Sequence, residues 1–239
     1  MREDEIKKSI AKGVKIVGRL KREQEMANQA WSHFVSLNDA YNSVDGQWKA
    51  SLNTLSQSAR LFQVADALIR DTLMACFRLL DLDDSGITLL RIHEILSIQA
   101  VRTNRLSFFA QCQFTSQDQA IERIDLFMSY FPTEWSSDAK QKRWPKQNEC
   151  PKDWTLADLR AELVPVRHRL IAHAGTFSRN VPIEKIDKLV KLTDELVCLA
   201  EWLFKGCSAS TLTARQTETV AFWGAIQNGF INSACPSKS

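Results

Sequence analysis

Apolar side chains recur at steps of three and four residues along most of this chain, which is the spacing that one face of an α-helix requires. Helices are therefore expected over residues 3–41, 58–80, 88–99, 116–131, 155–174, 183–204 and 213–230. Eight glycines and six prolines in 239 residues are too few for the frequent turns of an all-β protein. The pattern predicts an all-α protein.

Local signals mark several helix ends. Ser116 is a suitable N-cap for the helix over 116–131, and Gly206 is placed to end the helix over 183–204. Pro165 lies inside the helix over 155–174, where its ring would clash with the carbonyl group of Ala161. We therefore expect Pro165 to kink that helix or to divide it.

The broadest apolar stripe lies over residues 58–80 and is wide enough for a central helix of a bundle. No repeat, low-complexity tract or second domain is visible. We expect an N-terminal helical extension over 1–30, an up-and-down helical bundle over 31–206, and a C-terminal helix and tail over 207–239.

Charge and cysteine content limit the classes of function. The net charge of +3 arises from 31 basic and 28 acidic residues, so an anionic partner would have to meet a local cluster of cations. The six cysteines form no CxxC pair, and we interpret them as reduced packing thiols. The charged start and the absence of a long apolar run favour the cytoplasm and predict no contact with a membrane.

The densest group of chemically useful side chains is Arg167, His168, Arg169 and His173, on the helix predicted over 155–174. Histidine can take or give a proton near neutral pH. Arginine carries a permanent charge and can hold a phosphate oxygen through two hydrogen bonds. RNA brings its own nucleophile, the 2′-hydroxyl group, so this set suits cleavage of a phosphodiester without a metal ion.

A purely structural interpretation of the same residues is also open. Arg167 and Arg169 could pair with the acidic neighbours Glu162 or Asp158, and His173 could stabilise the C-terminal end of its helix. The chain would then be a plain helical interaction protein.

The string R-H-R-L-I-A-H at 167–173 resembles the R-x(4–6)-H motif of HEPN domains. The strings S-A-R-L-F at 58–62 and L-M-A-C-F-R-L-L-D at 73–81, and a helix that starts at Thr88, are similar to the abortive-infection subgroup of that superfamily. The resemblance covers about 31–206, and the Arg/His motif is its specific part.

The resemblance implies a HEPN-type bundle that acts as a metal-independent endoribonuclease without a cofactor. It implies a homodimer in which two motifs face one cleft, in phage defence or in a toxin-antitoxin system, where an antitoxin or another regulatory protein would be a partner. His173 would transfer protons, Arg167 would hold the phosphate in the transition state, and His168 would orient the site. Arg169 is a candidate for a flanking phosphate.

Some HEPN domains lack catalysis and serve as modules that bind RNA or proteins, which leaves a second interpretation of the same fold. Pro165 is a departure, because it stands two residues before the motif.

A basic segment is a second candidate for RNA contact. Lys140, Lys142 and Arg143 could follow an RNA backbone while the indole ring of Trp144 stacks on a base. The alternative is a solvated loop with the tryptophan against the bundle.

No metal site is expected. The Asp81-to-Gly86 stretch opens like an EF-hand loop, but Ile92 stands where the bidentate glutamate would be required. His33 and His93 have no ligand-like spacing around them and are expected to be ordinary surface or boundary residues.

Overall fold

The computed structural model of this protein describes residues 2–43, 56–81, 88–111, 116–131, 155–172 and 182–206, with the backbone alone at 56–60, 155 and 170–172. Within these ranges the protein has seven α-helices and no strand, so the all-α prediction is confirmed. The helix expected over 213–230 lies outside the described residues.

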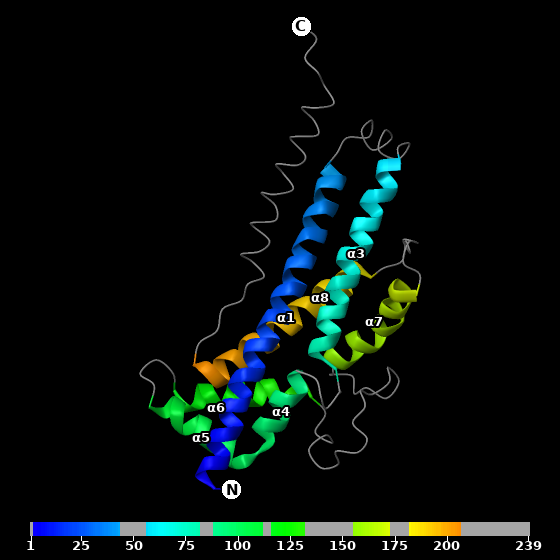
Figure 1. Ribbon diagram of the computed structural model, residues 1–239. Helices are drawn as coiled ribbons and strands as arrows, with labels where there is room; N and C mark the ends of the chain where they lie inside the picture. The colour runs from blue at the N-terminus through cyan, green and yellow to red at the C-terminus, as the bar shows by residue number, and fades with distance from the viewer. Residues whose placement is uncertain are drawn as a thin grey trace.

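Three long helices form the centre of the molecule. Helix α1 (Glu3–Ser43) has 41 residues and is about 60 Å long at 1.5 Å per residue. Helices α3 (Ser56–Leu79) and α8 (Ile183–Lys205) pack along it, and α3 runs beside the upper half of α1 in Figure 1. Lys21 of α1 contacts Glu201 of α8, and Trp31 of α1 contacts Asp187 of α8. Residue numbers therefore increase along α1 in the direction in which they decrease along α8, so the two helices are antiparallel.

Three shorter helices gather at the N-terminal end of α1 (Figure 1). They are α4 (Leu89–Ser97), α5 (Gln99–Ala110) and α6 (Gln117–Ser129). Helix α7 (Thr155–Ala172) packs instead against α3 and α8. The core joins all of these helices through fully buried residues such as Leu20, Leu73, Leu96, Ile124, Leu163 and Leu203.

The expected end signals at α6 and α8 are confirmed. The Ser116 hydroxyl group accepts a hydrogen bond from the Gln119 amide at 3.1 Å, and the Gln119 side chain accepts one from the Ser116 amide at 3.2 Å. Gly206 has φ 79°, in the left-handed region, and its N–H donates to the carbonyl group of Trp202 at 2.8 Å. Both devices satisfy backbone groups that a helix end leaves without partners.

Helix α5 is an element that the hydrophobic pattern did not predict. We expected one helix over 88–99, but α4 ends at Ser97 and α5 begins at Gln99. The buried positions of α5 are Val101, Arg105 and Phe109, spaced by four residues. An arginine therefore occupies the middle of the buried face, where it interrupts the apolar spacing.

Arg105 is tolerated there because of where its guanidinium group lies. Its Nε donates to the backbone carbonyl oxygen of Leu203 at 2.7 Å, in the last turn of α8, where a cation interacts favourably with the helix dipole. The group also lies 4.3 Å from the ring centroid of Phe108.

Pro165 does not divide its helix, since α7 continues from Thr155 to Ala172. The side chain of Pro165 is exposed. Proline has no N–H to donate to the carbonyl group of Ala161, and on this solvent-facing side of the helix water can take the place of the missing donor.

The boundary expected near residue 30 falls inside α1, which is continuous across it. Val17, Leu20 and Ala27, all before residue 30, are fully buried in the core. Gly13 is also buried, and a Cβ atom added to it would overlap the ring of Phe204 on α8. The first half of α1 is thus packed into the bundle. In the part of the chain that the structure describes, no helix is long and apolar enough to cross a membrane.

Candidate functional site

Helix α7 carries the motif arginine and the residues that follow it. Arg167 is partly buried, whereas His168 and Arg169 are exposed. Successive residues of a helix are turned by about 100°, so Arg167 can face the bundle while its two neighbours face solvent. The motif therefore lies at the edge of the buried stripe of α7.

Arg167 is held against an aromatic ring. Its guanidinium carbon lies 5.1 Å from the ring centroid of Phe77, a residue of α3 that is 2% exposed. This distance is within the range of a cation–π interaction. The Nε atom of Arg167 is buried and has no hydrogen-bond partner among the described residues.

The acidic neighbours considered from the sequence do not neutralise the motif arginines within the described residues. Glu162 pairs with Lys185 of α8, with an N–O distance of 2.6 Å. The Nε of Arg169 donates to the backbone carbonyl oxygen of Pro165 at 3.3 Å. Both arginines are thus left with donors that a phosphate group could use.

Arg160 is a neighbour of the site that the sequence did not single out. It lies seven residues before Arg167, nearly two full helical turns, and its guanidinium carbon is 5.5 Å from the same Phe77 ring centroid. Burial lowers the pKa of Arg160 to about 10; Asp81 opposes this shift and the nearby charge of Arg167 adds to it. An arginine seven residues upstream on the same helix face was the signal that could have found it.

Several predicted site residues lie outside the described residues: His173, Lys140, Lys142, Arg143 and Trp144. The structure therefore brings together Arg167 and Arg160 and places His168 and Arg169 beside them on the solvent side.

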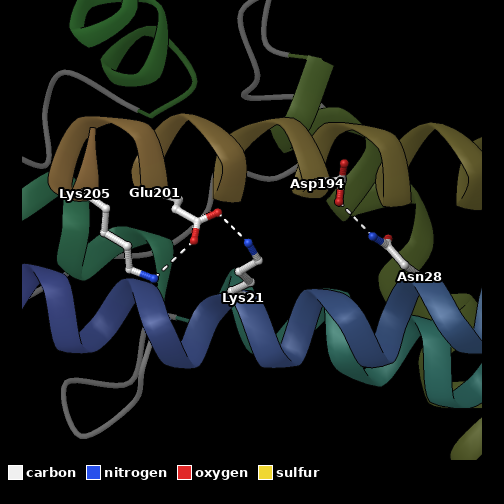
Figure 2. Close-up of polar contacts among 5 residues, drawn as sticks. All are labelled: Lys21, Asn28, Asp194, Glu201 and Lys205. Atoms are coloured by element: carbon white, nitrogen blue, oxygen red, sulfur yellow. Dashed lines mark hydrogen bonds and ion pairs between the residues drawn. The ribbon is translucent and has the colours of Figure 1, made fainter. Parts of the chain in front are cut away.

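A second polar cluster crosses the interface of α1 and α8, which we call the α1–α8 seam (Gln24, Asn28, Asp194, Lys21, Glu201 and Lys205; Figure 2 shows all but Gln24). The Nδ2 of Asn28 donates to the Asp194 carboxylate at 2.7 Å, and Nε2 of Gln24 donates to Oδ1 of Asn28 at 2.8 Å. Asn28 is fully buried and Asp194 is 7% exposed, so this amide and this carboxylate satisfy each other inside the bundle, whereas the buried Oε1 of Gln24 has no hydrogen-bond partner among the described residues.

The Glu201 end of the seam is an ion-pair network. Lys21 of α1 contacts one carboxylate oxygen of Glu201 at 2.7 Å, and Lys205 contacts the other at 3.1 Å. Burial by itself raises the pKa of Glu201, but the hydrogen bonds from the two lysines outweigh burial, so its pKa lies below the usual value. The hydrogen bond between Lys21 and Glu201 also raises the pKa of Lys21.

The cysteines and possible metal ligands can be judged only in the described part of the chain. Cys76 and Cys198 are free thiols there. Burial raises the pKa of Cys76 to about 12 and that of Cys198 to about 11, as expected for packing thiols. No group of three His, Cys, Asp or Glu side chains that could hold a metal ion occurs among the described residues.

Comparison of the whole chain with protein families, with curated proteins and with solved structures found no match.

Proposed function

We propose that this protein is a HEPN-type, metal-independent endoribonuclease with an up-and-down bundle, and that Arg167 holds the phosphate group at which the RNA chain is cut. The observation that carries the proposal is the state of Arg167. Its guanidinium group is fixed against Phe77, no carboxylate of the described residues forms an ion pair with it, and its buried Nε has no partner.

A guanidinium group that is held in place and lacks an acidic partner is preorganised to bind an oxyanion. Its orientation is set in advance by the ring, so little side-chain freedom is lost when a phosphate binds. Partial burial strengthens the attraction between the cation and the charge that grows on the phosphate oxygens in the transition state.

The reaction uses the nucleophile that RNA provides. His173 takes the proton from the 2′-hydroxyl group, the 2′-oxygen attacks phosphorus, and the bond to the 5′-oxygen breaks. The leaving 5′-oxygen takes a proton from water, the protonated His173 returns its proton to solvent, and the products are a 2′,3′-cyclic phosphate and a 5′-hydroxyl end. His168, exposed one residue after Arg167, would orient the RNA, and Arg169 would hold a flanking phosphate.

The proposal includes a homodimer in which two motifs share one cleft, and a role in phage defence or in a toxin-antitoxin system with an antitoxin or another regulatory protein as partner. Lys140, Lys142, Arg143 and Trp144 would extend the RNA-binding surface. No resident cofactor is needed, and the protein would act in the cytoplasm.

The test is cleavage of a set of single-stranded RNAs in the presence of EDTA, with the product ends identified. The wild type is compared with Arg167→Lys, Arg167→Ala and His173→Ala. The matched control is Arg123→Ala, because Arg123 also lies over an aromatic ring, at 4.2 Å from the Trp202 centroid, but belongs to α6.

We expect cyclic phosphate ends from the wild type and from Arg123→Ala. Cleavage should fall about 100-fold or more in Arg167→Ala and in His173→Ala. Arg167→Lys keeps the charge but loses the planar fork, and we expect it to be strongly impaired. If no protein cleaves any RNA, but RNA binding by the wild type is retained in His173→Ala, the chain is a binding module and the nuclease proposal is wrong.

A further inference from the structure

The exposed side of the N-terminal half of α1 (blue in Figure 1) is a row of cations. Residues 6–22 hold seven basic side chains and no acidic one. Five of the seven are exposed and share one face of the helix, and we call them the basic stripe: Lys8, Lys12, Lys15, Arg19 and Arg22. At about 100° and 1.5 Å per residue, they fall within an arc of about 80° and form a row about 21 Å long.

The acids near the stripe lie at its ends or pair with other cations. The two lysines of residues 6–22 that lie off the stripe have partners, since Lys7 pairs with Glu3 and Lys21 with Glu201, each at 2.7 Å. Asp4 and Glu5 precede the stripe. Glu23 follows it and pairs with Arg78 of α3 at 2.9 Å. The middle of the stripe, at Lys12, Lys15 and Arg19, has no acid on its face of the helix.

A single exposed cation without an acid is ordinary at a protein surface, but a row of five is not. Cations three or four residues apart on a helix repel each other and destabilise the helix. The exposed face of α8 shows the usual alternative, because it mixes both signs: Glu184, Lys188, Lys191 and Glu195. The stability of α1 therefore does not account for the stripe, whereas an anion that lies along it does.

We propose that the basic stripe is a docking surface for the backbone of a single-stranded RNA, with consecutive phosphates along the row. A flexible strand can follow a straight helix face, so that each cation reaches a phosphate. Contacts to phosphates carry no information about the bases, so binding does not depend on sequence. The choice of RNA rather than DNA rests on the function proposed above; the contact with a phosphate backbone does not.

A membrane surface is a poorer match for this face of α1. A helix that lies on a membrane inserts its apolar side among the lipids. The apolar side of α1 is already used by the bundle, where Val17 and Leu20 are fully buried. Within the described residues, Met26 is the large apolar side chain that α1 exposes, at 55%. One such side chain offers little surface for insertion.

The test measures binding separately from cleavage. The probe is a fluorescent 2′-O-methyl uridine oligonucleotide of about 16 residues, which has no free 2′-hydroxyl group and cannot be cut by the proposed reaction. Fluorescence anisotropy gives its affinity over a range of salt concentrations in EDTA. The stripe variant combines Lys12→Gln, Lys15→Gln and Arg19→Gln. The matched control removes three exposed charges from α8 by combining Lys185→Gln, Lys188→Gln and Lys191→Gln.

We expect the stripe variant to bind about tenfold or more weakly than the wild type. The slope of log affinity against log salt should become shallower by about 2, because each lost phosphate contact removes about 0.7. The α8 variant has the same net charge and should bind nearly as the wild type does. A variant that keeps the charges of the stripe, Lys12→Arg with Lys15→Arg and Arg19→Lys, should also bind like the wild type. Urea unfolding checks that all variants fold.

Equal losses in the stripe variant and the α8 variant would show that net charge alone matters and would overturn the surface, as would a wild type that does not bind the oligonucleotide. Vesicles that contain phosphatidylserine and a polyglutamate peptide are tested beside it. If the stripe variant loses binding to either of these but keeps its affinity for the oligonucleotide, or if a DNA strand of equal length binds much more tightly, RNA is not the occupant. Binding through the stripe without cleavage of ordinary RNA by any protein would leave the surface standing and overturn the proposed nuclease.

Discussion

Two polar regions of this protein differ in how their charges are balanced. In the α1–α8 seam, Asn28 bonds to Asp194 and two lysines bond to Glu201, so each charge has a partner (Figure 2). At the edge of α7, Arg160 and Arg167 share the ring of Phe77, and the Nε of Arg167 has no partner in the described part of the chain.

The difference separates polar residues that support the fold from polar residues that are available to a ligand. Polar groups buried between two helices lower stability unless they satisfy each other, and once satisfied they favour a single register of the helices. A cation left without an acid contributes little to stability and can gain its partner from outside. We therefore expect substitutions in the seam to change stability and substitutions on α7 to change binding.

The largest effect is expected for Asn28→Leu. This substitution removes the donor to the Asp194 carboxylate, which is buried, and should lower the free energy of unfolding by about 3 kcal/mol. Urea unfolding measures the change. Asn28→Leu combined with Asp194→Leu should recover part of the loss, because no buried carboxylate is then left without this donor. A loss below about 1 kcal/mol would show that the seam is not a stabilising network.

The second effect concerns the close packing of the same two helices. Gly13→Ala places a methyl group against the buried ring of Phe204 and should cost about 2 kcal/mol, as overpacking does. Gly18→Ala is the matched control, because a Cβ atom there meets nothing within 4 Å. It should raise stability by about 1 kcal/mol through helix propensity. The same sign for both variants in urea unfolding would contradict the packing of α1 on α8.

The third effect is a pH dependence at Glu201. Its pKa is lower in the folded protein than in the unfolded chain, so its contribution to stability is present above the unfolded value of about 4.3 and is lost as the pH falls through the folded value. The difference in unfolding free energy between the wild type and Glu201→Gln should be constant above about pH 5 and should shrink below it. Glu122→Gln, at an exposed position of α6, is the control. A difference that does not change down to pH 3 would exclude this ion-pair network.

The smallest effect on stability is expected for Arg167→Gln. Loss of the contact with Phe77 and relief of the repulsion from Arg160 act in opposite directions, and the free energy of unfolding should change by less than about 1 kcal/mol. The measurement is urea unfolding beside Asn28→Leu. A loss as large as that of Asn28→Leu would mean that Arg167 is a structural residue and would remove the contrast between the two regions.

Properties that depend on neighbours along the chain could be predicted from the sequence. The helical periodicity, the N-cap at Ser116 and the helix end at Gly206 all involve groups within four residues of one another. For the same reason the sequence was sufficient to place Arg167, His168 and Arg169 on one helix. The sequence did not predict helix α5, because Arg105 on its buried face interrupts the apolar spacing. The hydrogen-bond partner of Arg105, the carbonyl oxygen of Leu203, lies on α8 and is distant in the sequence.

Pairings between helices were decided only by the tertiary structure. Asn28 and Asp194 are 166 residues apart, and Arg160 and Arg167 meet the ring of Phe77 on a different helix. Such contacts depend on how far each helix is rotated about its axis and how closely two helices approach, as Gly13 and Phe204 do. Periodicity shows which face of a helix is buried, but the packing of many side chains at once determines which polar group that face meets.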